Sequence, residues 1–529
     1  MTDAYARDRT GFVWRVPKRF NIAQAVVDRH DPDALALIQV KGDGKTREWR
    51  FGEIARASAR LAHALKGQGL RLGDRLAILL PQAPETAIAH VAAYRSGLVA
   101  VPLFTLFGPD ALAYRLSDSG ARAVVTDPEG WIKLQSIRDQ LPADLVALVV
   151  GQGAHGNGAL DFDLACAQAS DDFPPLDTSA DDPAVIIYTS GTTGSPKGAL
   201  HAHRVLLGHL PGVEWPHDRF PQAGDRFWTP ADWAWIGGLL DVLLPSWFHG
   251  VPVIAHRMAK FEPDRAADLI RRHGARNLFM PPTALKLMRD ASGDRLDIRS
   301  VASGGEPLGE ALLEWGRARF GKTINEFYGQ TECNLVVGQS GDWRMKPGSM
   351  GRPIPGHEVA VVNESGETLR PDEVGTIAIR RPDPVMFLGY WNRPEATAEK
   401  FAGDWLLTGD QGRMDPDGFL WFVGRDDDVI TSAGYRIGPG ELEECLLRHP
   451  AVALAAVVGL PDELRTETVT AFVVLRAGFE ASAALAVELQ SFVKARVAAH
   501  AYPREIRFRE SLPMTTTGKI MRRVLRDGG

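Results

Sequence analysis

Short apolar runs alternate with amphipathic stretches along the first half of the chain. The runs at 74–80 (DRLAILL), 98–103 (LVAVPL) and 121–127 (ARAVVTD) have the length and composition of buried strands. Between the first two lies 83–97 (APETAIAHVAAYRSG), which predicts a helix ending at glycine. Strand-like runs return further on: VPVIAH (251–256), ARNLFMP (275–281) and IRSVASGG (298–305). This alternation predicts βαβ units and parallel sheets.

The pattern changes twice in the second half. From about Gly351, HEVAVVN and GTIAIR flank the turn-forming ESGE, which predicts antiparallel strands. Beyond GRDDDVI (424–430) come two helix-like and two strand-like segments: PGELEECLLRHP, VALAAVVGL, TVTAFVVL and AVELQSFVKARVAA. We therefore predict an α/β fold with a large N-terminal domain of βαβ layers (1–424), which includes parallel sheets and a small antiparallel β subdomain. A small α+β domain (425–529) follows, with the boundary close to Arg425.

Length and charge narrow the class of protein. The chain has 529 residues, which is too long for a single hydrophobic core. Its net charge of -6 does not suggest an electrostatic binder of nucleic acid. An acidic ligand would therefore need a positive site built locally.

The cysteines and apolar segments indicate a compartment. Three scattered cysteines, Cys166, Cys333 and Cys445, fit neither a disulfide framework nor a zinc site, which favours a reducing cytoplasm. No uncharged apolar stretch reaches the ~18 residues needed to cross a bilayer. The N-terminal MTDAYARDRTGFVW mixes acids and bases and lacks the apolar region of a secretory signal.

The segment IIYTSGTTGSPKGAL (186–200) resembles a phosphate-binding loop. Its spacing is not that of a Walker motif, since Lys197 is followed by Gly198. Glycines let the backbone approach a ligand closely, and Lys197 adds a positive charge. The hydroxyl donors are Thr189, Ser190, Thr192, Thr193 and Ser195, and the glycines are Gly191, Gly194 and Gly198. These residues suit a polyphosphate, although a Ser/Gly-rich surface turn has a similar composition.

Four further segments follow this loop in order: SGGEPL (303–308), NEFYGQTE (325–332), TGD (408–410) with GRDDD (424–428), and TTTGKI (515–520). With this set, the chain resembles the AMP-forming adenylating enzymes over nearly its whole length. That family includes acyl- and aryl-CoA synthetases, luciferases and the adenylation domains of peptide synthetases. Taken as a whole, the sequence most resembles those of the medium-chain acyl-CoA synthetases.

The resemblance implies an ATP site. The loop would hold the β- and γ-phosphates through Thr189, Ser190, Gly191, Thr192, Thr193, Gly194 and Lys197. Asp410 matches the aspartate that accepts both ribose hydroxyls, and Arg425 matches a second ribose or phosphate contact. Gly304, Gly305, Glu306 and Pro307 match the segment that lines the adenine. The remaining nucleotide-binding positions are Tyr328 and Gly329. A plain strand-to-helix turn with Pro307 early in the helix is the alternative for the adenine segment.

The resemblance also implies catalytic groups. Thr331 and Glu332 match the α-phosphate ligand and the Mg²⁺ ligand, because a divalent cation makes a carboxylate favourable among phosphates. Lys519 matches the catalytic lysine, whose ammonium would stabilise the charge that builds when a carboxylate attacks an anionic phosphate. The alternative for Glu332 is a solvated glutamate at a helix start, and the alternative for Lys519 is a place in a solvated basic tail.

In this family the C-terminal domain is mobile and takes two orientations, one for each half-reaction. Asp427 lies where family members have a pivot residue. The segment AGYRIGPGELE (433–443) matches the one that faces the pantetheine arm of CoA. Gly434 would allow the thiol arm to approach, and Arg436 would meet a CoA phosphate. A strand, turn and helix opened by Pro439 would give the same local pattern.

The implied reaction joins a carboxylic acid to CoA with ATP and Mg²⁺, through an acyl-adenylate. Gly329 stands where acetate-using relatives carry a tryptophan, so we expect an acid larger than acetate, of medium-chain, branched or aromatic type. Trp235 matches an aromatic residue beside the acyl pocket, and Trp233 is an extra aromatic that either narrows the pocket or packs in the core.

One departure and several alternatives accompany this interpretation. Thr466 stands where the family often has glycine, which puts the local loop shape in doubt. An enzyme that loads a carrier-protein phosphopantetheine, a non-catalytic ATP-binding protein and a P-loop NTPase are the alternative functions. A homo-oligomer is possible, and no nucleic-acid partner is expected.

Overall fold

The computed structural model describes residues 4–151, 158–189, 195–258, 260–305, 308, 310–425, 430–513, 520 and 522–527. The first large sheet has the strand order β16-β15-β14-β13-β12-β10-β11-β1-β2. Neighbours from β14 to β1 are parallel, and the remaining edge strands are antiparallel. Its strands are β1 (Leu35–Val40), β2 (Thr46–Arg50), β10 (Phe227–Trp228), β11 (Val253–Ala255), β12 (Asn277–Phe279), β13 (Ser300–Gly304), β14 (Ile324–Gln330), β15 (Cys333–Gly338) and β16 (Arg352–Pro353).

The second large sheet has the order β19-β9-β8-β4-β3-β5-β6-β7. Strands from β8 to β7 are parallel to their neighbours, whereas β9 and β19 add in antiparallel fashion at one edge. Its strands are β3 (Arg75–Leu79), β4 (Val99–Pro102), β5 (Ala121–Thr126), β6 (Val146–Val149), β7 (Leu160–Asp161), β8 (Pro183–Thr189), β9 (Lys197–Ala202) and β19 (Gly389–Tyr390). The predicted parallel sheets are confirmed.

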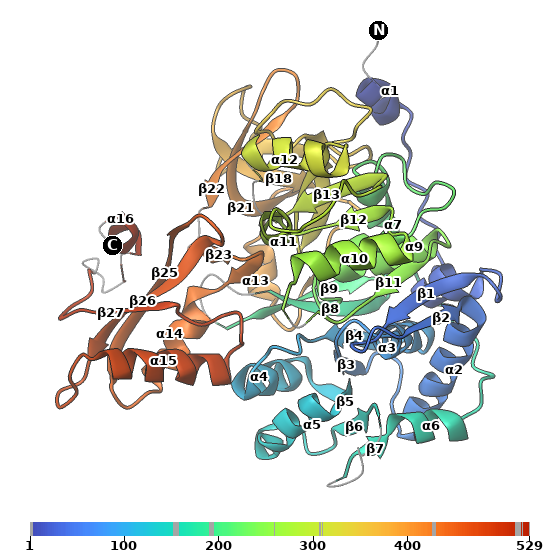
Figure 1. The fold of residues 1–529 in the computed structure, drawn as a ribbon, viewed down its shortest axis with the longest axis horizontal. Helices are drawn as coiled ribbons and strands as arrows, with labels where there is room; N and C mark the ends of the chain where they lie inside the picture. The colour runs from blue at the N-terminus through green and yellow to red at the C-terminus, as the bar shows by residue number, and fades with distance from the viewer. Residues whose placement is uncertain are drawn as a thin grey trace.

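Helices connect and cover these sheets (Figure 1). They are α2 (Phe51–Gly67), α3 (Pro84–Arg95), α4 (Pro109–Ser119), α5 (Pro128–Gln135), α6 (Phe162–Gln168), α7 (Val205–Glu214), α8 (Ile236–Gly238), α9 (Leu244–Phe248), α10 (Pro263–His273), α11 (Pro282–Met288), α12 (Glu310–Phe320) and α13 (Pro394–Ala398). The predicted helix at 83–97 is α3, which starts with proline and is followed by Gly97 at φ 67°. Nearly every side chain of α3 is buried, as expected for a helix enclosed by other elements.

Two smaller sheets follow along the chain. The antiparallel sheet contains β17 (Val359–Val362), β18 (Gly375–Arg380), β20 (Phe401–Ala402), β21 (Trp405–Met414) and β22 (Leu420–Arg425). The C-terminal sheet contains β23 (Ile430–Ser432), β24 (Tyr435–Ile437), β25 (Val452–Asp462), β26 (Thr466–Leu475) and β27 (Glu505–Phe508), with α14 (Pro439–Leu447), α15 (Ala483–Arg496) and α16 (Arg522–Asp527). The fold class predicted from the sequence is therefore confirmed.

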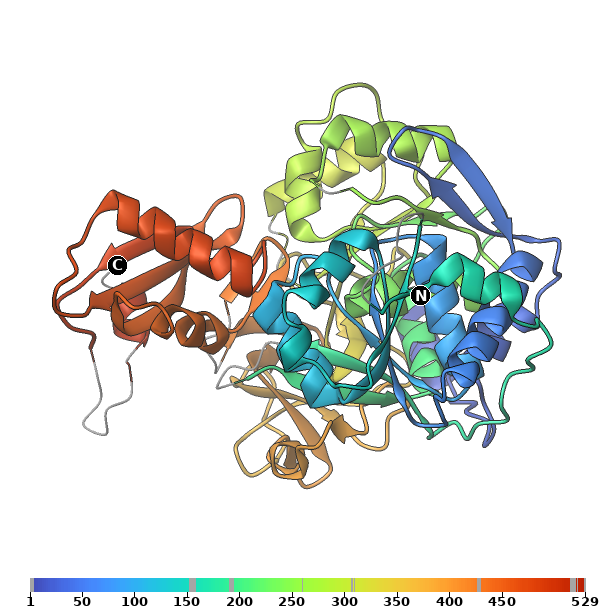
Figure 2. The same ribbon diagram turned by 90° about the horizontal axis from the view of Figure 1, so that it is seen from below.

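The chain changes sheets between Arg425 and Ile430. Residues from Ile430 onward, here named the C-terminal region, project from one side of the molecule, in orange to red in Figure 2. This position agrees with a domain boundary at Arg425, which stays a prediction, and the expected hinge at Asp427 lies outside the described residues.

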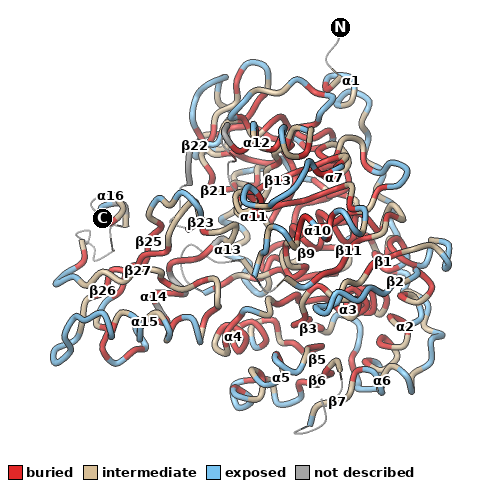
Figure 3. Tube along the Cα trace, viewed as in Figure 1, coloured by how far each residue is buried: buried red, intermediate tan, exposed pale blue. Residues whose placement is uncertain are grey.

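Buried residues run through all the sheets, as the red segments of Figure 3 show. One hydrophobic cluster crosses between the two parts of the chain. It joins Phe107 and Leu112, beside the second sheet, to Ile437, Leu489 and Val497 of the C-terminal region. The two parts thus share a desolvated contact in this arrangement.

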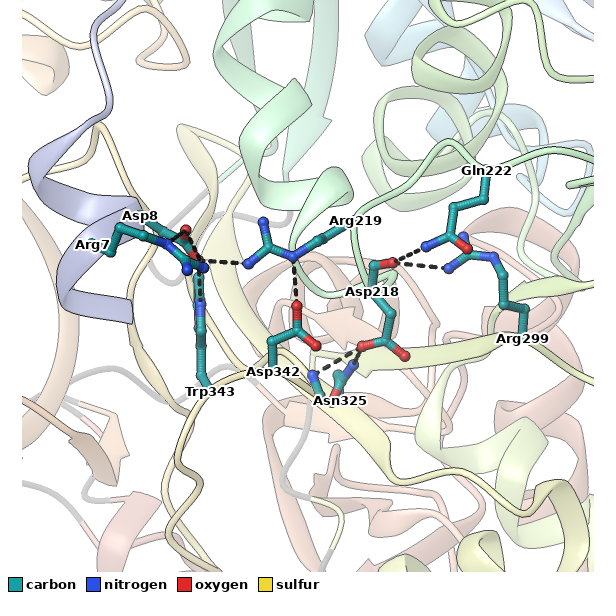
Figure 4. Close-up of polar contacts among 10 residues, drawn as sticks. Arg7, Asp8, Asp218, Arg219, Gln222, Arg299, Asn325, Asp342 and Trp343 are labelled. Carbon is teal, nitrogen blue, oxygen red and sulfur yellow. Dashed lines mark hydrogen bonds and ion pairs between the residues drawn. The ribbon is translucent and has the colours of Figure 1, made fainter. Parts of the chain in front are cut away.

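Polar contacts fasten the N-terminal helix α1 (Ala4–Thr10) to the body of the molecule (Figure 4). Asp8 accepts hydrogen bonds from Arg219 Nη2 and Trp343 Nε1, each at 3.0 Å. Arg219 also pairs with Asp342. The helix is therefore held against the loops that follow α7 and β15. Within the described part of the chain, no helix is long and apolar enough to cross a membrane.

Candidate active site

A cavity of about 470 Å³ lies where the carboxyl ends of strands from both large sheets meet the C-terminal region. Its walls include Gln82 after β3, Phe104 after β4, Asp232 after β10, His256 after β11 and Thr331 after β14. Ligands of α/β proteins bind at this end of parallel strands. The position makes this cavity the candidate active site.

The ends of the predicted phosphate loop face this cavity. Thr189 ends β8 and pairs in register with Lys197, which opens β9, and both line the cavity. The Lys197 ammonium lies 5.3 Å from the centre of the Tyr390 ring. The loop residues Ser190, Gly191, Thr192, Thr193 and Gly194 lie outside the described residues. A cation is therefore present where the loop returns to the sheet.

Glu332 and Thr331 lie on the same cavity, directly after β14. The Glu332 carboxylate accepts a hydrogen bond from the Tyr390 hydroxyl, and its backbone oxygen accepts one from Phe387 N at 2.8 Å. Tyr390 thus stands between the site's lysine and its glutamate. Sequence motifs missed this tyrosine, because it comes from a two-residue edge strand that has no periodic signal.

The carboxylate of Glu332 fits the expected Mg²⁺. This ion usually binds one or two protein carboxylates, water and substrate phosphates, not an all-protein cage. The described residues contain no cluster of three or more potential ligands among His, Cys, Asp and Glu. One carboxylate beside a phosphate site is the donor set that Mg²⁺ bound to ATP requires.

Asp410 lies in β21 and is buried, with 3% of its surface exposed. Its Oδ2 accepts hydrogen bonds from the Tyr328 hydroxyl at 2.7 Å and from Gln330 Nε2 at 2.6 Å. In the sheet register Asp410 stands opposite Arg425 on β22. Three of the residues assigned to the nucleotide by resemblance, Asp410, Tyr328 and Arg425, are therefore neighbours. Gln330 was missed, although it lies within the matched motif.

The adenine segment begins at the end of β13. A Cβ on Gly304 would lie 2.5 Å from the Phe327 ring, so β13 and β14 can approach closely only with glycine there. Gly305 has φ of 96°, a conformation that other residues rarely adopt. Glu306 and Pro307 lie outside the described residues. The two glycines thus shape a tight turn at the carboxyl end of a parallel strand.

An aromatic wall borders the cavity on the acyl side. Trp235 lines it and packs on Phe279, with ring centres 5.6 Å apart. A Cβ on Gly237 would lie 2.8 Å from the Phe279 ring, so this packing also requires glycine. Trp233, in contrast, is completely buried and belongs to the main hydrophobic cluster. Of the two tryptophans, Trp233 therefore packs in the core.

The prediction that Gly329 leaves open space in the acyl pocket is wrong in this structure. A Cβ at this position would lie 2.3 Å from Leu335 N and 2.7 Å from the Asn334 Cα. The backbone of β15 fills that side of the strand, and Gly329 does not line the cavity. The resemblance to the family could not show that a side chain at position 329 would point toward β15 and not into the cavity.

The C-terminal region supplies the facing wall. Gly434 and Tyr435 line the cavity, and a Cβ on Gly434 would lie 3.4 Å from the Pro281 Cβ. Tyr435 stacks on His500 with ring centres 4.0 Å apart, and Phe104 lies 6.2 Å from Tyr435. Burial raises the pKa of Tyr435 to about 12 and lowers that of His500 to about 3. Both groups are therefore neutral near pH 7.

Two other residues of this region were predicted to be functional, Arg436 and Lys519, and the structure does not place either side chain at the cavity. Arg436 lies in β24 and pairs with Thr431 in the sheet. Lys519 lies outside the described residues. The residue after it, Ile520, packs with Leu512 and Leu525 in a cluster of C-terminal residues, and none of these three lines the cavity.

Thr466, which replaces the family's usual glycine, keeps a glycine-like conformation. Its φ is 70°, which is rare for a β-branched residue. Its Oγ1 accepts a hydrogen bond from Lys286 Nζ on α11 at 3.2 Å. The loop shape is therefore retained, and the threonine adds a contact between the C-terminal region and the rest of the chain.

Comparisons with known proteins agree with this geometry. The AMP-binding enzyme model matches residues 23–391, and the AMP-binding enzyme C-terminal domain matches residues 441–519. Acyl-coenzyme A synthetase ACSM4, mitochondrial, of Homo sapiens is 38% identical over 97% of this chain and 91% of that protein. Acetyl-coenzyme A synthetase of Bacillus subtilis (strain 168) is 36% identical over 96% of this chain and 90% of that protein.

Solved structures show the same likeness over the whole chain. The crystal structure of Brucella canis acyl-CoA synthetase has a TM-score of 0.73 and 36% sequence identity, with 99% of this chain and 96% of that chain covered. The chain therefore belongs to the family of AMP-binding enzymes.

Proposed function

We propose a reaction course and a substrate class for this chain, which is an AMP-forming acyl-CoA ligase that uses ATP, Mg²⁺ and CoA. The observation that carries the proposal is a single cavity shared by two groups of residues. Lys197, Thr331 and Glu332 line it from the nucleotide side, and Gly434 and Tyr435 line it from the C-terminal side. Activation of the acid and transfer to the thiol can therefore occur in one place.

In the first half-reaction, a carboxylate oxygen attacks the α-phosphorus of ATP and pyrophosphate leaves. Lys197 and the loop before it would hold the departing phosphates, and Thr331 would contact the α-phosphate. Mg²⁺, held by Glu332, would offset phosphate charge. Asp410 would anchor the ribose. We assign Lys519 to the stabilisation of the transition state, which requires it to enter the cavity.

In the second half-reaction, the CoA thiol displaces AMP. The present arrangement suits this step, because Ala433, Gly434 and Tyr435 line the cavity, with Gly434 beside Pro281. Ile520, next to Lys519, packs away from the cavity in the C-terminal cluster. We propose that the C-terminal region turns about the chain near Asp427 to bring Lys519 in for adenylation.

We propose an acid larger than acetate, of medium-chain, branched or aromatic type. The apolar side chains of Trp235, Phe261 and Leu287 on the cavity wall support a long acyl group. Each buried CH₂ contributes about 0.8 kcal/mol, so a few added carbons produce a strong preference. A relative named for acetyl-CoA synthesis is 36% identical, which makes acetate the competing substrate.

The test is release of pyrophosphate from Mg-ATP with acids from acetate to decanoate, together with isobutyrate and benzoate, with and without CoA. A thioester product formed best from a longer acid is expected. Acetate as the best acid would reject the substrate class. Thioester formed only on a phosphopantetheine carrier protein would assign the carrier-loading alternative, and absence of acid-dependent release would indicate a non-catalytic nucleotide binder.

The cellular setting is also a proposal. Cys333 and Cys445 are buried and Cys166 is partly buried, and scattered cysteines of this kind suit a reducing compartment such as the cytoplasm. The human relative named above is mitochondrial by name. Fractionation of the native host would decide between these compartments, and light scattering of the purified chain would test for the homo-oligomer.

A further inference from the structure

The cavity contains a carboxyl group to which the motifs of the sequence assign no role. Asp232 follows β10 and lines the same cavity as Gly434 and Tyr435. Its Oδ1 accepts a hydrogen bond from Ala234 N at 2.9 Å, and its backbone oxygen accepts one from Trp235 N at 3.1 Å. These bonds form a tight turn that places the carboxyl between the acyl wall and the C-terminal wall.

The turn is held rigidly without any ligand. Gln82 Nε2 donates to the backbone oxygens of Thr229, at 3.0 Å, and of Ala231. On the other side, a Cβ on Gly238 would lie 2.2 Å from the Asp232 backbone oxygen, so the turn packs directly on α8. The position of the Asp232 carboxyl is therefore fixed before substrates bind, as catalytic groups require.

Thioester formation must remove the proton of the CoA thiol, since the thiolate is the nucleophile. Among the described residues that line the cavity, the side chains with a carboxylate or imidazole are Asp232, Glu332, His256 and His500. Glu332 is the expected metal ligand. His256 Nδ1 faces a backbone carbonyl at 2.8 Å, and its Nε2 is enclosed by protein. His500 is a weak base, because burial lowers its pKa to about 3.

The surroundings of Asp232 suit a base that works near neutral pH. Burial raises the pKa of its carboxyl to about 6, against smaller opposing effects of the Ala234 N–H and the Arg257 guanidinium. The phenol of Tyr435 faces it from β24, and its own pKa is raised by burial and by the Asp232 charge. Above pH 6 the carboxyl is therefore mostly ionised and more basic than an exposed aspartate.

We propose that Asp232 is the general base of thioester formation. The thiol proton passes to the Asp232 carboxylate while the sulfur forms a bond to the acyl carbonyl carbon. The bond from that carbon to the phosphate oxygen breaks, and AMP leaves with the electron pair. Asp232 then gives the proton to water. This inference rests on the proposed function, because it concerns the second half-reaction of the ligase.

The variant Asp232→Asn tests it, since the amide oxygen can still accept from Ala234 N. Single-turnover reaction of hexanoyl-adenylate with CoA reports the thioester step, and acid-dependent exchange of pyrophosphate into ATP without CoA reports adenylation. We expect exchange to stay within about twofold of the wild type. The thioester step should slow by about 10²-fold near pH 7. That deficit should shrink about tenfold per pH unit toward the thiol pKa of about 8.5, as solution supplies the thiolate.

Two controls sharpen the result. Asp241→Asn changes a buried carboxyl that pairs with Asn334 at 2.7 Å and does not line the cavity, so it should keep the wild-type pH profile. Asp232→Glu should restore the loss in part, even if the amide variant folds poorly. An equal loss of both half-reactions, or a deficit that is constant with pH, would overturn the proposal. Failure of the wild type to form a thioester with CoA from any acid of the panel would instead reject the proposed function and this inference with it.

Discussion

The two walls of the cavity are held in different ways. On the nucleotide side, the lining residue Gln330 belongs to a hydrogen-bond network behind the wall, where Asp410 accepts from Gln330 at 2.6 Å and from Tyr328 at 2.7 Å. On the acceptor side, the C-terminal region meets the rest of the chain through a shared hydrophobic cluster and hydrogen bonds between loops. Gly108 N donates to Val497 O at 2.6 Å, within the short contact between the loop after β4 and the end of α15.

This difference indicates a division of labour. The groups proposed to hold the nucleotide would be needed in both half-reactions, and Asp410 among them is fixed by burial, its sheet register and its hydrogen bonds. The groups proposed to serve one half-reaction are on the C-terminal region, whose hydrophobic and hydrogen-bonded contacts with the rest would have to break and re-form between the two steps. The predictions below act on one wall or on the other, from the largest expected effect to the smallest.

Lys519→Ala should have the largest effect. Loss of a charge that stabilises the transition state should slow adenylation by on the order of 10²–10³-fold. Thioester formation from supplied acyl-adenylate should stay close to the wild type, because the lysine serves the other orientation. Exchange of pyrophosphate and single-turnover transfer measure the two steps. Equal loss in both would reject separate orientations.

Asp410→Ala should affect both steps. It removes the carboxylate that accepts from the Tyr328 hydroxyl and from the Gln330 amide, which keeps its bond to the Thr408 backbone oxygen at 3.0 Å. A hydrogen bond to a charged group contributes about 1.5–3 kcal/mol. The KM for ATP should rise roughly 10–100-fold, and both half-reactions should slow. Tyr328→Phe, which removes one donor and keeps the carboxylate, should show a smaller rise. A normal KM in the alanine variant would mean that Asp410 is only structural.

Phe104→Ala should weaken the acceptor wall alone. The Phe104 ring lies 6.2 Å from Tyr435 and 5.9 Å from His500, and such pairs contribute about 0.5–1.5 kcal/mol beyond burial. Thioester formation should slow about 3–10-fold while pyrophosphate exchange is retained. Phe104→Leu keeps apolar volume and should lose less. A greater loss of adenylation than of transfer would contradict the assignment of this wall.

Thr466→Gly should have the smallest effect on catalysis. It should slow the thioester step slightly and increase the stability of the protein. It relieves a left-handed backbone that costs about 1–3 kcal/mol in a non-glycine residue. It also removes the bond from Lys286, so the thioester step should slow about 2–5-fold. Lys286→Met removes that bond without relieving strain. The melting temperature should therefore rise only in the glycine variant. Equal melting temperatures in the two variants would contradict the claim that the Thr466 backbone is strained.

Much of the fold could be predicted because its signals are local. Apolar runs predicted β3, β4 and β5, and a glycine marked the end of α3. Motifs assigned residues to the nucleotide, and three of them, Lys197, Thr331 and Glu332, line one cavity, while their roles stay a prediction. Local sequence was sufficient for residues of a matched motif that open or directly follow a strand, as Lys197 and Thr331 do.

The remaining features depend on contacts between distant segments. Tyr390 reaches Glu332 only because β19 adds to the edge of the second sheet beside β9. Asp232 becomes notable only when the C-terminal region closes the cavity over it. Gly329 was misjudged because a register shift in β14 and the backbone of β15 determine where its Cβ would point.

The most direct test of the two-wall account measures both half-reactions in Lys519→Ala and Phe104→Ala side by side. The account predicts opposite patterns, with adenylation lost and transfer kept in the first variant, and adenylation kept and transfer slowed in the second. The same ratio of the two rates in both variants would contradict it, because one rigid site would then serve both steps.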